Sequence, residues 1–366
     1  MTGKIVLENL KHKPMRTLLS FLLIGVPVTL ILALVGLTRG MQDDAARRAR
    51  GTGADIIVRG TNAASAISFS AAALPEKMED FLQHQPHVRL AMGDVEHPIE
   101  LPLRVMGVDL PKLTEMSGGL TYLEGGPFGG PDDMIVDQYY AAQRHIHAGD
   151  TIRVMNRPWH ISGVIDGGKL SHILVPLQTL QSLDAATGKL SQVFLKLDDP
   201  ANADLVKKEL QQKLGPDYPI LTMADLESLL SVNNIQGVKQ FTIVVVVIGV
   251  VIGFAVVCLS MYMAVLQRTR EIGILKSLGG SNWFILQIIL AEALILGAGG
   301  TALGILLSFG AYWLIHLFVP ASIPMVIVPV WWPIAGAITL GGALLGALYP
   351  GLSAARHDPI EALAYE

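Results

Sequence analysis

The sequence predicts a membrane α-helical protein with four transmembrane helices and a large α+β domain inserted between the first and second helix. Hydrophobic residues make up 51% of the 366 residues and charged residues only 16%, against about 25% charged residues in a soluble globular chain. The deficit of charge is confined to four long apolar runs, and a stretch of mixed composition separates the first run from the other three. This distribution indicates membrane segments joined to an ordinary folded domain.

Each apolar run is long enough for a membrane-spanning helix, which takes about 20 residues. The run Leu18–Leu37 carries no charge and is longer than the apolar core of a signal peptide, about 7–15 residues, so we expect a retained helix. The third run is longer than one span needs and contains Glu292, so we expect this span to begin near Leu290 with Glu292 close to an interface. The predicted transmembrane helices cover 18–40, 239–266, 287–318 and 331–352, with a short external loop at 319–330.

The basic residues of the short connections predict the orientation. Lys and Arg precede the first span and recur between the second and third spans, whereas the loop between the third and fourth spans has none. Four arginines follow the first span, but they begin a long domain, where the rule is weak. We therefore expect a multi-pass protein with both termini, including the tail 353–366, in the cytoplasm.

The insert 41–238 then lies outside and is large enough to bury its own core. Alternating hydrophobicity predicts strands at 55–60, 101–108, 150–165 and 192–198. Capping residues and prolines predict helices at 74–84, 176–186, 200–214 and 224–232. The sequence shows no solenoid repeat here.

The loop 267–286 carries several charges between two nearly uncharged runs. On a helical wheel its apolar residues gather on one side, which predicts a short amphipathic helix along the membrane interface. Gly279 and Gly280 would end this helix, and Ser281 or Asn282 would cap the next one. An ordinary basic loop is the competing interpretation, but it leaves Glu271 on the apolar side unexplained.

Three pairs of glycines are spaced four residues apart within the spans, which permits close approach of helices in lipid. They either pack the helices of one chain together or form an interface between two copies. The residues are Gly249, Gly253, Gly300, Gly304, Gly342 and Gly346.

No pattern in the sequence predicts an enzyme active site. The P-loop pattern G-x-x-x-x-G-K-[ST] and the nucleophile elbow G-x-S-x-G are both absent. His145 and His147 would share one face of a strand, but a third metal ligand at recognisable spacing is missing, so we predict no metal site. The net charge of −4 gives no nucleic-acid footprint.

Several segments resemble the FtsX-like permeases of ABC transporters, of the MacB and LolC type. RTREIGILKSLGGSNWFI (268–285) is similar to that family's R-x-R-E-I-G-x-x-[KR]-[AS]-x-G segment, and YPGLSAARHDPIEALAYE (349–366) to its C-terminus. Glu292 and GAGGTALGILL (297–307) match the segment that opens the third span. ENLKHKPMRTLLS (8–20) resembles the amphipathic N-terminal helix, here 1–17. Segments 122–128, 147–165 and 175–183 resemble the periplasmic domain, so the resemblance covers nearly the whole chain.

The resemblance implies a type VII mechanotransmission permease of the bacterial inner membrane. Such a chain transmits ATP-driven motion to its periplasmic domain, for efflux or extraction of a lipid, lipoprotein, peptide or drug-like substrate. It implies a dimer of identical or different permeases, membrane lipid around it, and a possible periplasmic adaptor. No cofactor is implied on this chain, since ATP and Mg would bind the partner ATPase. MacB-type proteins usually carry that ATPase fused, so we expect a separate ATPase chain here.

The resemblance also implies that 267–286 is a coupling helix in contact with the ATPase. By position we expect this interface to comprise Arg268, Arg270, Glu271, Ile272, Gly273, Leu275, Lys276 and Gly279. For Ile272 and Leu275, anchoring the helix to the membrane interface is an equal alternative. Two other functions stay open: an FtsX-like regulator of a periplasmic partner such as a cell-wall hydrolase, and a membrane-anchored binding or sensor protein without an ATPase.

Overall fold

The computed structural model describes residues 14–60, 73–100, 103–230, 236–267, 274, 277, 279, 281–322 and 324–356. The chain divides into two compact units. The first comprises Met1–Arg39, Gly237–Leu314 and Met325–Glu366, and the second comprises Gly40–Gln236 and Ile315–Pro324. The predicted N-terminal helix 1–17 lies outside the described residues up to residue 13.

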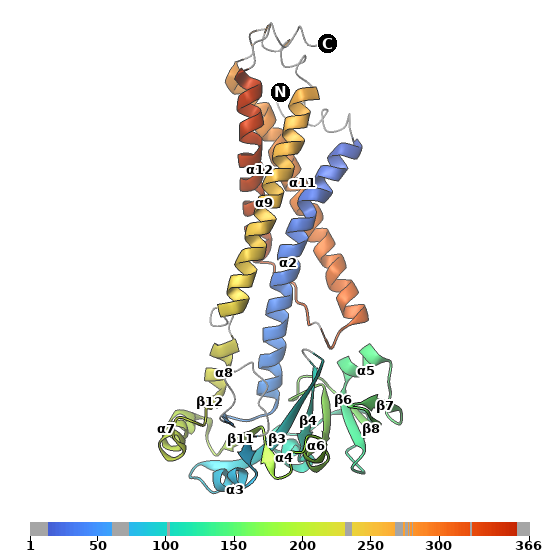
Figure 1. Cartoon of the computed structure of the whole chain (residues 1–366), viewed down its shortest axis with the longest axis vertical. Helices are drawn as coiled ribbons and strands as arrows, with labels where there is room; N and C mark the ends of the chain where they lie inside the picture. The colour runs from blue at the N-terminus through green and yellow to red at the C-terminus, as the bar shows by residue number, and fades with distance from the viewer. Residues whose placement is uncertain are drawn as a thin grey trace. The chain divides into compact units, whose positions relative to one another are not determined.

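The first unit consists of long helices (Figure 1). They are α2 (Pro14–Gly51), α9 (Gln236–Gln267), α11 (Asn282–Phe318) and α12 (Trp331–Arg356), and the last parts of α2 and α11 belong to the second unit. Within the described residues three helical segments are long and apolar enough to cross a membrane: Thr17–Gly51, Asn282–Phe318 and Trp331–Ser353. Three of the four predicted spans thus coincide with helices that could cross a membrane. The span 239–266 falls inside the 32-residue helix α9 and stays a prediction.

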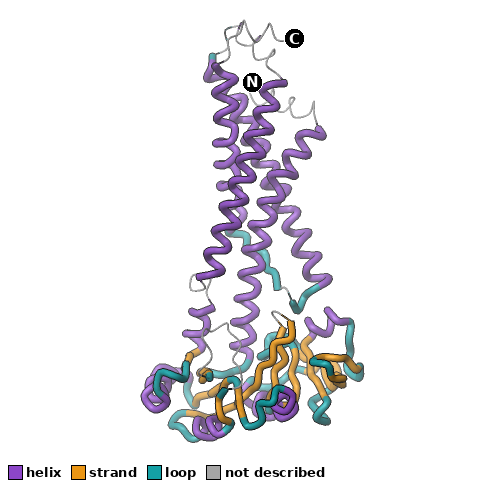
Figure 2. Tube along the Cα trace, viewed as in Figure 1, coloured by secondary structure: helices purple, strands orange, loops and turns teal. Residues whose placement is uncertain are grey.

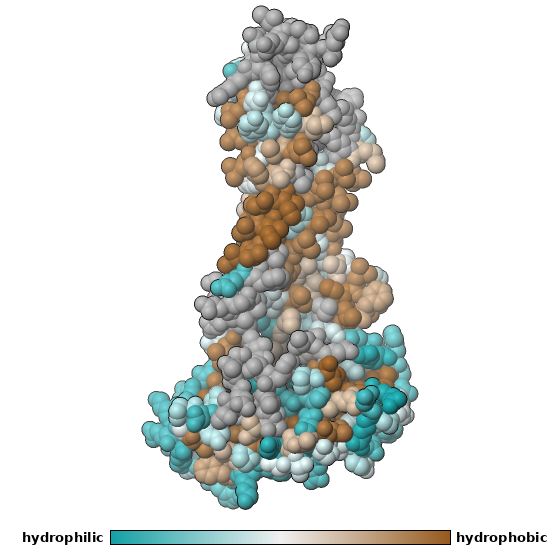
Figure 3. All heavy atoms as spheres, in the orientation of Figure 1, coloured by the Kyte–Doolittle hydropathy of each residue, from teal (hydrophilic) through white to brown (hydrophobic). Residues whose placement is uncertain are grey.

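The outward faces of these helices are apolar, as a lipid environment requires. Leu30, Leu306 and Leu345 are each more than half exposed although they belong to helices. Figure 3 shows hydrophobic side chains over the long helices and mostly hydrophilic ones over the surface of the second unit. Exposed leucines of this kind are typical of helices that face lipid or another membrane helix.

Helix α2 continues well beyond residue 40, where we predicted the first span to end. Its last part, MQDDAARRARG, is polar but rich in Ala and Arg, which favour helix, and Arg48 and Arg50 complement the dipole in the last turn. The helix ends at Gly51, and Gly53 follows with a φ of +74°. Likewise, α11 begins at Asn282, before the predicted start at 287, with no break before Leu290.

The second unit is built on a ten-stranded mixed sheet of described residues, seen as orange tubes in Figure 2. The strand order is β12-β1-β11-β3-β4-β9-β6-β8-β5, β7 pairs with β8, and β2 pairs with β10 separately. The pairs β4–β9 and β6–β8 are parallel and the others are antiparallel. The strands are β1 (Ile56–Arg59), β2 (Leu74–Pro75), β3 (Val88–Glu100), β4 (Leu103–Val108), β5 (Tyr122–Gly125), β6 (Asp133–Asp137), β7 (Thr151–Val154), β8 (Arg157–Ile165), β9 (Ile173–Pro176), β10 (Lys189–Leu190), β11 (Gln192–Leu197) and β12 (Ile220–Thr222).

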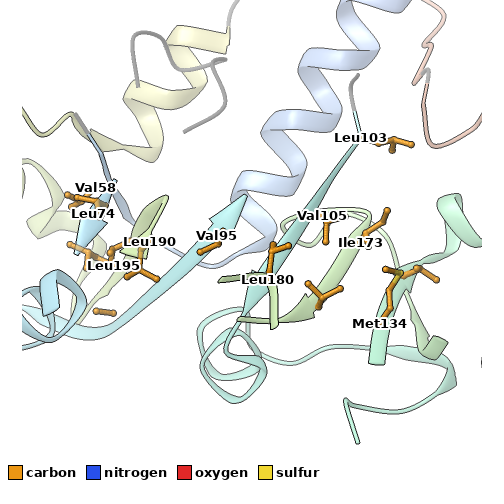
Figure 4. Packing of buried hydrophobic residues seen from close by; sticks show 14 of the residues in the cluster. Val58, Leu74, Val95, Leu103, Val105, Met134, Ile173, Leu180, Leu190 and Leu195 are labelled. Atoms are coloured by element: carbon orange, nitrogen blue, oxygen red, sulfur yellow. The ribbon is translucent and has the colours of Figure 1, made fainter. Parts of the chain in front are cut away.

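Helices cover both faces of this sheet. They are α3 (Lys77–Gln83), α4 (Leu110–Met116), α5 (Gln138–Arg144), α6 (Leu177–Leu183), the 3-10 turn η1 (Pro200–Asn202), α7 (Ala203–Leu214) and α8 (Met223–Leu230). One core cluster joins alternate strand residues such as Val105 and Leu195 to α3, α5, α6 and α7, and Figure 4 shows its side chains at close range. The other cluster joins the intervening residues, such as Met106 and Phe194, to α4, α8 and the end of α2.

The α+β class predicted for the insert is confirmed, and the four predicted strand regions lie on β1, β4, β7–β8 and β11. The predicted helices correspond to α3, α6, α7 and α8, although 74–75 form β2 instead. We did not predict the strands β3, β5, β6, β9 and β12 or the helices α4 and α5. Of these, β6 and β9 are short and buried on both faces, so they lack the alternation that marks a half-buried strand.

Candidate functional site

The predicted ATPase-coupling segment lies mostly outside the described residues. This applies to Arg268, Arg270, Glu271, Ile272, Gly273, Leu275 and Lys276. Of the described positions, Ile274 and Ser277 are helical, and the Ser277 hydroxyl donates to the Ile274 carbonyl at 2.8 Å. Ile274 is exposed. The contact of this segment with an ATPase stays a prediction.

The end of the coupling segment has the geometry of a helix stop followed by a helix start. Gly279 adopts a φ of +91°, a left-handed conformation that glycine reaches at no steric cost. Ser281 Oγ then accepts the backbone N–H of Phe284 at 3.2 Å, as an N-cap does for the helix α11. Of the two candidates from the sequence, Ser281 and Asn282, Ser281 is therefore the cap.

Gly300 and Gly304 of α11 pack against α2 in the first unit. A Cβ at Gly304 would lie 2.6 Å from Val28 Cβ and 2.8 Å from the Gly25 carbonyl oxygen. Thr29 Oγ1 lies 2.9 Å from the Gly25 carbonyl oxygen and 3.1 Å from that of Gly304. Small residues on both helices thus allow backbone contact within one chain.

Of the other glycines that we singled out, Gly249 and Gly342 lie in less crowded surroundings. Gly249 of α9 faces Ile31 and Pro27 of α2, where an added Cβ would meet Ile31 at 3.3 Å. Gly342 of α12 has open space at its Cβ position and lines a small apolar pocket with Gly249. Gly346 is buried, and the side-chain surroundings of Gly253 lie outside the described residues. Whether any of these residues contacts a second copy stays a prediction.

Glu292 is buried in α11, 6% exposed, near a cluster that contains Ile24, Ile289 and Ala343. Because α11 begins at Asn282, this residue lies in the third turn of a continuous helix. A buried acidic side chain in an apolar helix bundle is costly unless a polar partner stabilises it.

The end of α2 joins the rest of the second unit through a buried charged cluster that sequence reasoning missed. Arg48 donates from Nε to Asp44 Oδ2 at 2.7 Å and from Nη2 to Asp137 Oδ2 at 3.0 Å. His172 Nδ1 lies 2.8 Å from Asp137 Oδ2 and 2.9 Å from Arg48 Nη2. Asp137 is 1% exposed. We call Arg48, Asp137 and His172 the α2 joint.

Asp137 is held in its charged form by this joint. Burial alone would raise the pKa of Asp137. The hydrogen bond and charge of His172, the charge of Arg48 and the backbone N–H of Tyr140 outweigh burial and lower the pKa below its usual value. The N-cap position of Asp137, directly before the helix QYYAAQR, is the one local sequence signal that could have indicated it.

A second buried polar cluster crosses the sheet. Arg59, Gln192 and Asp94 lie opposite one another on β1, β11 and β3. Gln192 Nε2 donates to Asp94 Oδ2 at 3.1 Å and to Glu96 Oε1 at 2.8 Å, and Arg104 pairs with Glu96 at 3.4 Å. Burial, followed by the charge of Glu96, raises the pKa of Asp94 well above its usual value. The cluster balances two acids against two arginines, which is the composition of a structural network.

The predicted arrangement of His145 and His147 on one strand is wrong. His145 follows the last residue of α5 with a φ of +54°, and His147 lies in the loop after it, where its Nδ1 is 3.1 Å from Glu124. RHIHAGD ends a helix and forms a turn because its Gly and Asp favour turns. Among the described residues no group of three or more His, Cys, Asp or Glu side chains could hold a metal ion.

Two family models match the chain in succession. The model described as MacB-like periplasmic core domain matches residues 17–213. The model described as FtsX-like permease C-terminal matches residues 243–359. Together they cover the long helices and most of the α+β domain.

Curated relatives agree with these matches. A protein of Photorhabdus laumondii named macrolide export ATP-binding/permease protein MacB is 30% identical over 60% of this chain and 35% of its own length. The MacB of Salmonella paratyphi A is 26% identical over 78% of this chain and 48% of its own length. The chain thus spans about a third to a half of these relatives. Among solved structures, the periplasmic region of MacB from Actinobacillus actinomycetemcomitans aligns with 50% of this chain and 94% of its own, at 16% identity and a TM-score of 0.39.

Proposed function

Because this chain belongs to the family of FtsX-like permeases with a MacB-like periplasmic core domain, we propose that it is the permease subunit of an ABC exporter. In this proposal a separate ABC ATPase docks on the segment 267–286 in the cytoplasm of a bacterium. The permease, as a dimer in the inner membrane, passes the ATP-driven motion to its periplasmic domain. The transported molecule is a lipid, lipoprotein, peptide or drug-like compound.

The observation that carries the proposal is the continuity of α2. One unbroken helix runs from the apolar residues at Thr17 to Gly51, where the α2 joint locks its last turn to β6 and to the residue before β9. Pro27, Gly25 and Gly36 lie in the part of α2 that belongs to the first unit, and a helix can bend at such residues. Between Met41 and Arg50 the helix contains neither glycine nor proline, so a displacement of this part would reach the domain without the substrate crossing the membrane.

The packing within the first unit supports the same mechanism. Gly25, Gly300 and Gly304 bring α2 and α11 into backbone contact, so the two helices would move together. The coupling segment directly precedes α11, and Ser281 fixes the start of that helix. Motion of the coupling segment would thus pass into α11 and from there into α2.

The direct test is to purify the chain with its associated proteins and to measure ATP hydrolysis in lipid nanodiscs. We expect an ABC ATPase to co-purify, and Glu271→Lys to abolish the stimulation of its activity by the permease. Glu366→Lys makes the same charge change in the C-terminal tail and serves as the matched control. Normal stimulation in the Glu271→Lys variant would contradict the proposal.

The same preparation separates the two alternative functions. Crosslinking from the periplasmic domain to a cell-wall hydrolase, with an ATPase present, would favour the regulator. Purification without any ATPase, from cells that express the neighbouring genes, would favour the membrane-anchored binding protein.

A further inference from the structure

The short helix α5 (Gln138–Arg144) contacts two separate segments of the second unit at its two ends. One segment is the last part of α2, from Gly40 to Gly51, and the other is Ile315–Pro324. Both segments continue in sequence into helices of the first unit. The contacts described below lie entirely within the second unit.

At the beginning of α5, Asp137 is both the helix cap and the anchor of the α2 joint. Asp137 Oδ1 accepts the backbone N–H of Tyr140 at 2.9 Å, and Oδ2 binds Arg48 at 3.0 Å. The two oxygens of one carboxylate thus connect the first turn of α5 to the last turn of α2. Since the Arg48 side chain is 9% exposed and that of Asp137 1%, water screens this ion pair little.

At the end of α5, Gln143 holds the segment Ile315–Pro324 through both ends of its amide. Gln143 Oε1 accepts the backbone N–H groups of Ala321 at 2.9 Å and of Ser322 at 3.0 Å. Gln143 Nε2 donates to Ser322 Oγ at 2.7 Å. Ala321 is 1% exposed and belongs to the core cluster that also contains Tyr140 and Ala141 of α5.

These contacts hold the segment 315–324 in one position on α5. A buried N–H group needs an acceptor, and Gln143 supplies one for two successive residues of an irregular segment. Tyr140 and Ala141 in the middle of α5 are buried in the same core, which fixes the helix to the domain. The two ends of α5 then bind the two neighbouring segments.

We propose that α5 is a mechanical link that makes the segments 40–51 and 315–324 move together. Asp137 and Arg48 form its connection to the first segment, and Gln143 forms its connection to the second. Each of these residues acts as a positioning residue. The purpose of the link, to gather motion from two membrane helices into the domain, rests on the proposed function; the link itself does not.

Hydrogen–deuterium exchange on the full chain in lipid nanodiscs, without any ATPase, tests the link. Gln143→Ala removes the acceptor of two backbone N–H groups, and we expect exchange of the peptide 315–324 to rise roughly tenfold. The decisive measurement is the exchange in the segment that does not contact the substituted residue. Gln143→Ala also raises exchange in 40–51, and Arg48→Met raises it in 315–324, each by about threefold, because coupling between two sites is reciprocal.

Three further variants keep the result interpretable. Gln138→Ala makes the same substitution at the other end of α5, where Gln138 bonds only Asp166 on the surface, and should leave both segments unchanged. Gln143→Glu keeps the acceptor oxygens and should restore the protection of Ala321 and Ser322. Asp44→Asn weakens the hold on Arg48 from within α2 and replaces Arg48→Met if that variant does not fold.

Exchange that changes only beside each substitution would overturn the link, and so would equal effects in Gln138→Ala. These outcomes are independent of the proposed function, because no ATPase and no substrate are present. If the distant changes are found while no ATPase co-purifies with the wild-type chain, the link stands and the exporter proposal fails.

Discussion

Asp137 joins three parts of the second unit through one carboxylate. It caps α5, pairs with Arg48 of α2 and accepts a hydrogen bond from His172 before β9. These partners keep the pKa of Asp137 below its usual value in spite of burial, which alone would raise it. A carboxylate whose pKa is lower in the folded than in the unfolded state stabilises the fold above its unfolded pKa. That stability is lost as the pH falls through the folded value.

Replacing Asp137 should therefore have a pH-dependent effect. Asp137→Asn leaves Arg48 buried without its acidic partner on β6, and we expect the free energy of unfolding at pH 7 to fall by about 3 kcal/mol. The difference from wild type should shrink below about pH 4, where the unfolded chain begins to bind the proton. Thermal unfolding of the full chain in detergent across pH measures both effects.

The control for this measurement is Asp80→Asn, since the Asp80 side chain is 82% exposed. Its unfolding curve should match wild type at every pH. A loss of stability in Asp137→Asn that is the same at pH 3 and pH 7 would contradict the assignment of the effect to the charge of Asp137.

Among the elements, α2 and α11 pack closely together in the first unit. The contact depends on Gly304, where an added Cβ would lie 2.6 Å from Val28 Cβ. A valine at this position would force the two helices apart, because packed side chains and backbone leave no room for it.

We expect Gly304→Val to lower the unfolding free energy of the helical unit by about 2 kcal/mol. Gly310→Val is the matched control, since Gly310 lies on the same helix with nothing within 4 Å of its Cβ position. Thermal stability and yield of the two variants in detergent provide the comparison. Equal stability of both variants would show that α2 and α11 do not pack through Gly304.

The whole molecule combines an apolar helical unit with an α+β unit whose surface is polar. The core-domain model covers 17–213, which includes residues 17–39 of the helical unit, and the permease model covers 243–359. The orientation of this molecule in the membrane rests on the basic residues of its short connections and stays a prediction.

Cysteine labelling checks that orientation. In a Cys258→Ser background, which removes the single natural cysteine, we introduce Asp80→Cys in the domain and Glu366→Cys in the tail. A membrane-impermeant maleimide should label position 80 in intact spheroplasts and position 366 only after lysis. Labelling of both positions from the same side would contradict the predicted topology, and the Cys258→Ser chain alone should remain unlabelled.

Local patterns predicted much of the fold because the physical cause of each pattern is local. A run such as Leu18–Leu37 predicts a membrane-spanning helix. In hydrocarbon every backbone N–H and C=O group needs a partner within the protein, and a helix supplies these partners within a single segment. The alternation at 192–198 predicts β11, since successive side chains point to opposite faces of a strand. The pattern fails where both faces are buried, as in β9, and where a helix ends in a turn, as at His145.

The sequence by itself determined the apolar runs, the α+β class of the insert and the family resemblance, and it narrowed the cap of α11 to Ser281 or Asn282. Only the tertiary structure decided which polar residues meet: Arg48 with Asp137, 89 positions apart, and Gln143 with Ser322, 179 positions apart. Hydrophobic periodicity predicts that a residue is buried, but it does not identify the residues that contact it. The partner of a buried charge or amide follows from how the strands and helices pack, and in this chain those partners form the contacts through which α5 holds two segments together.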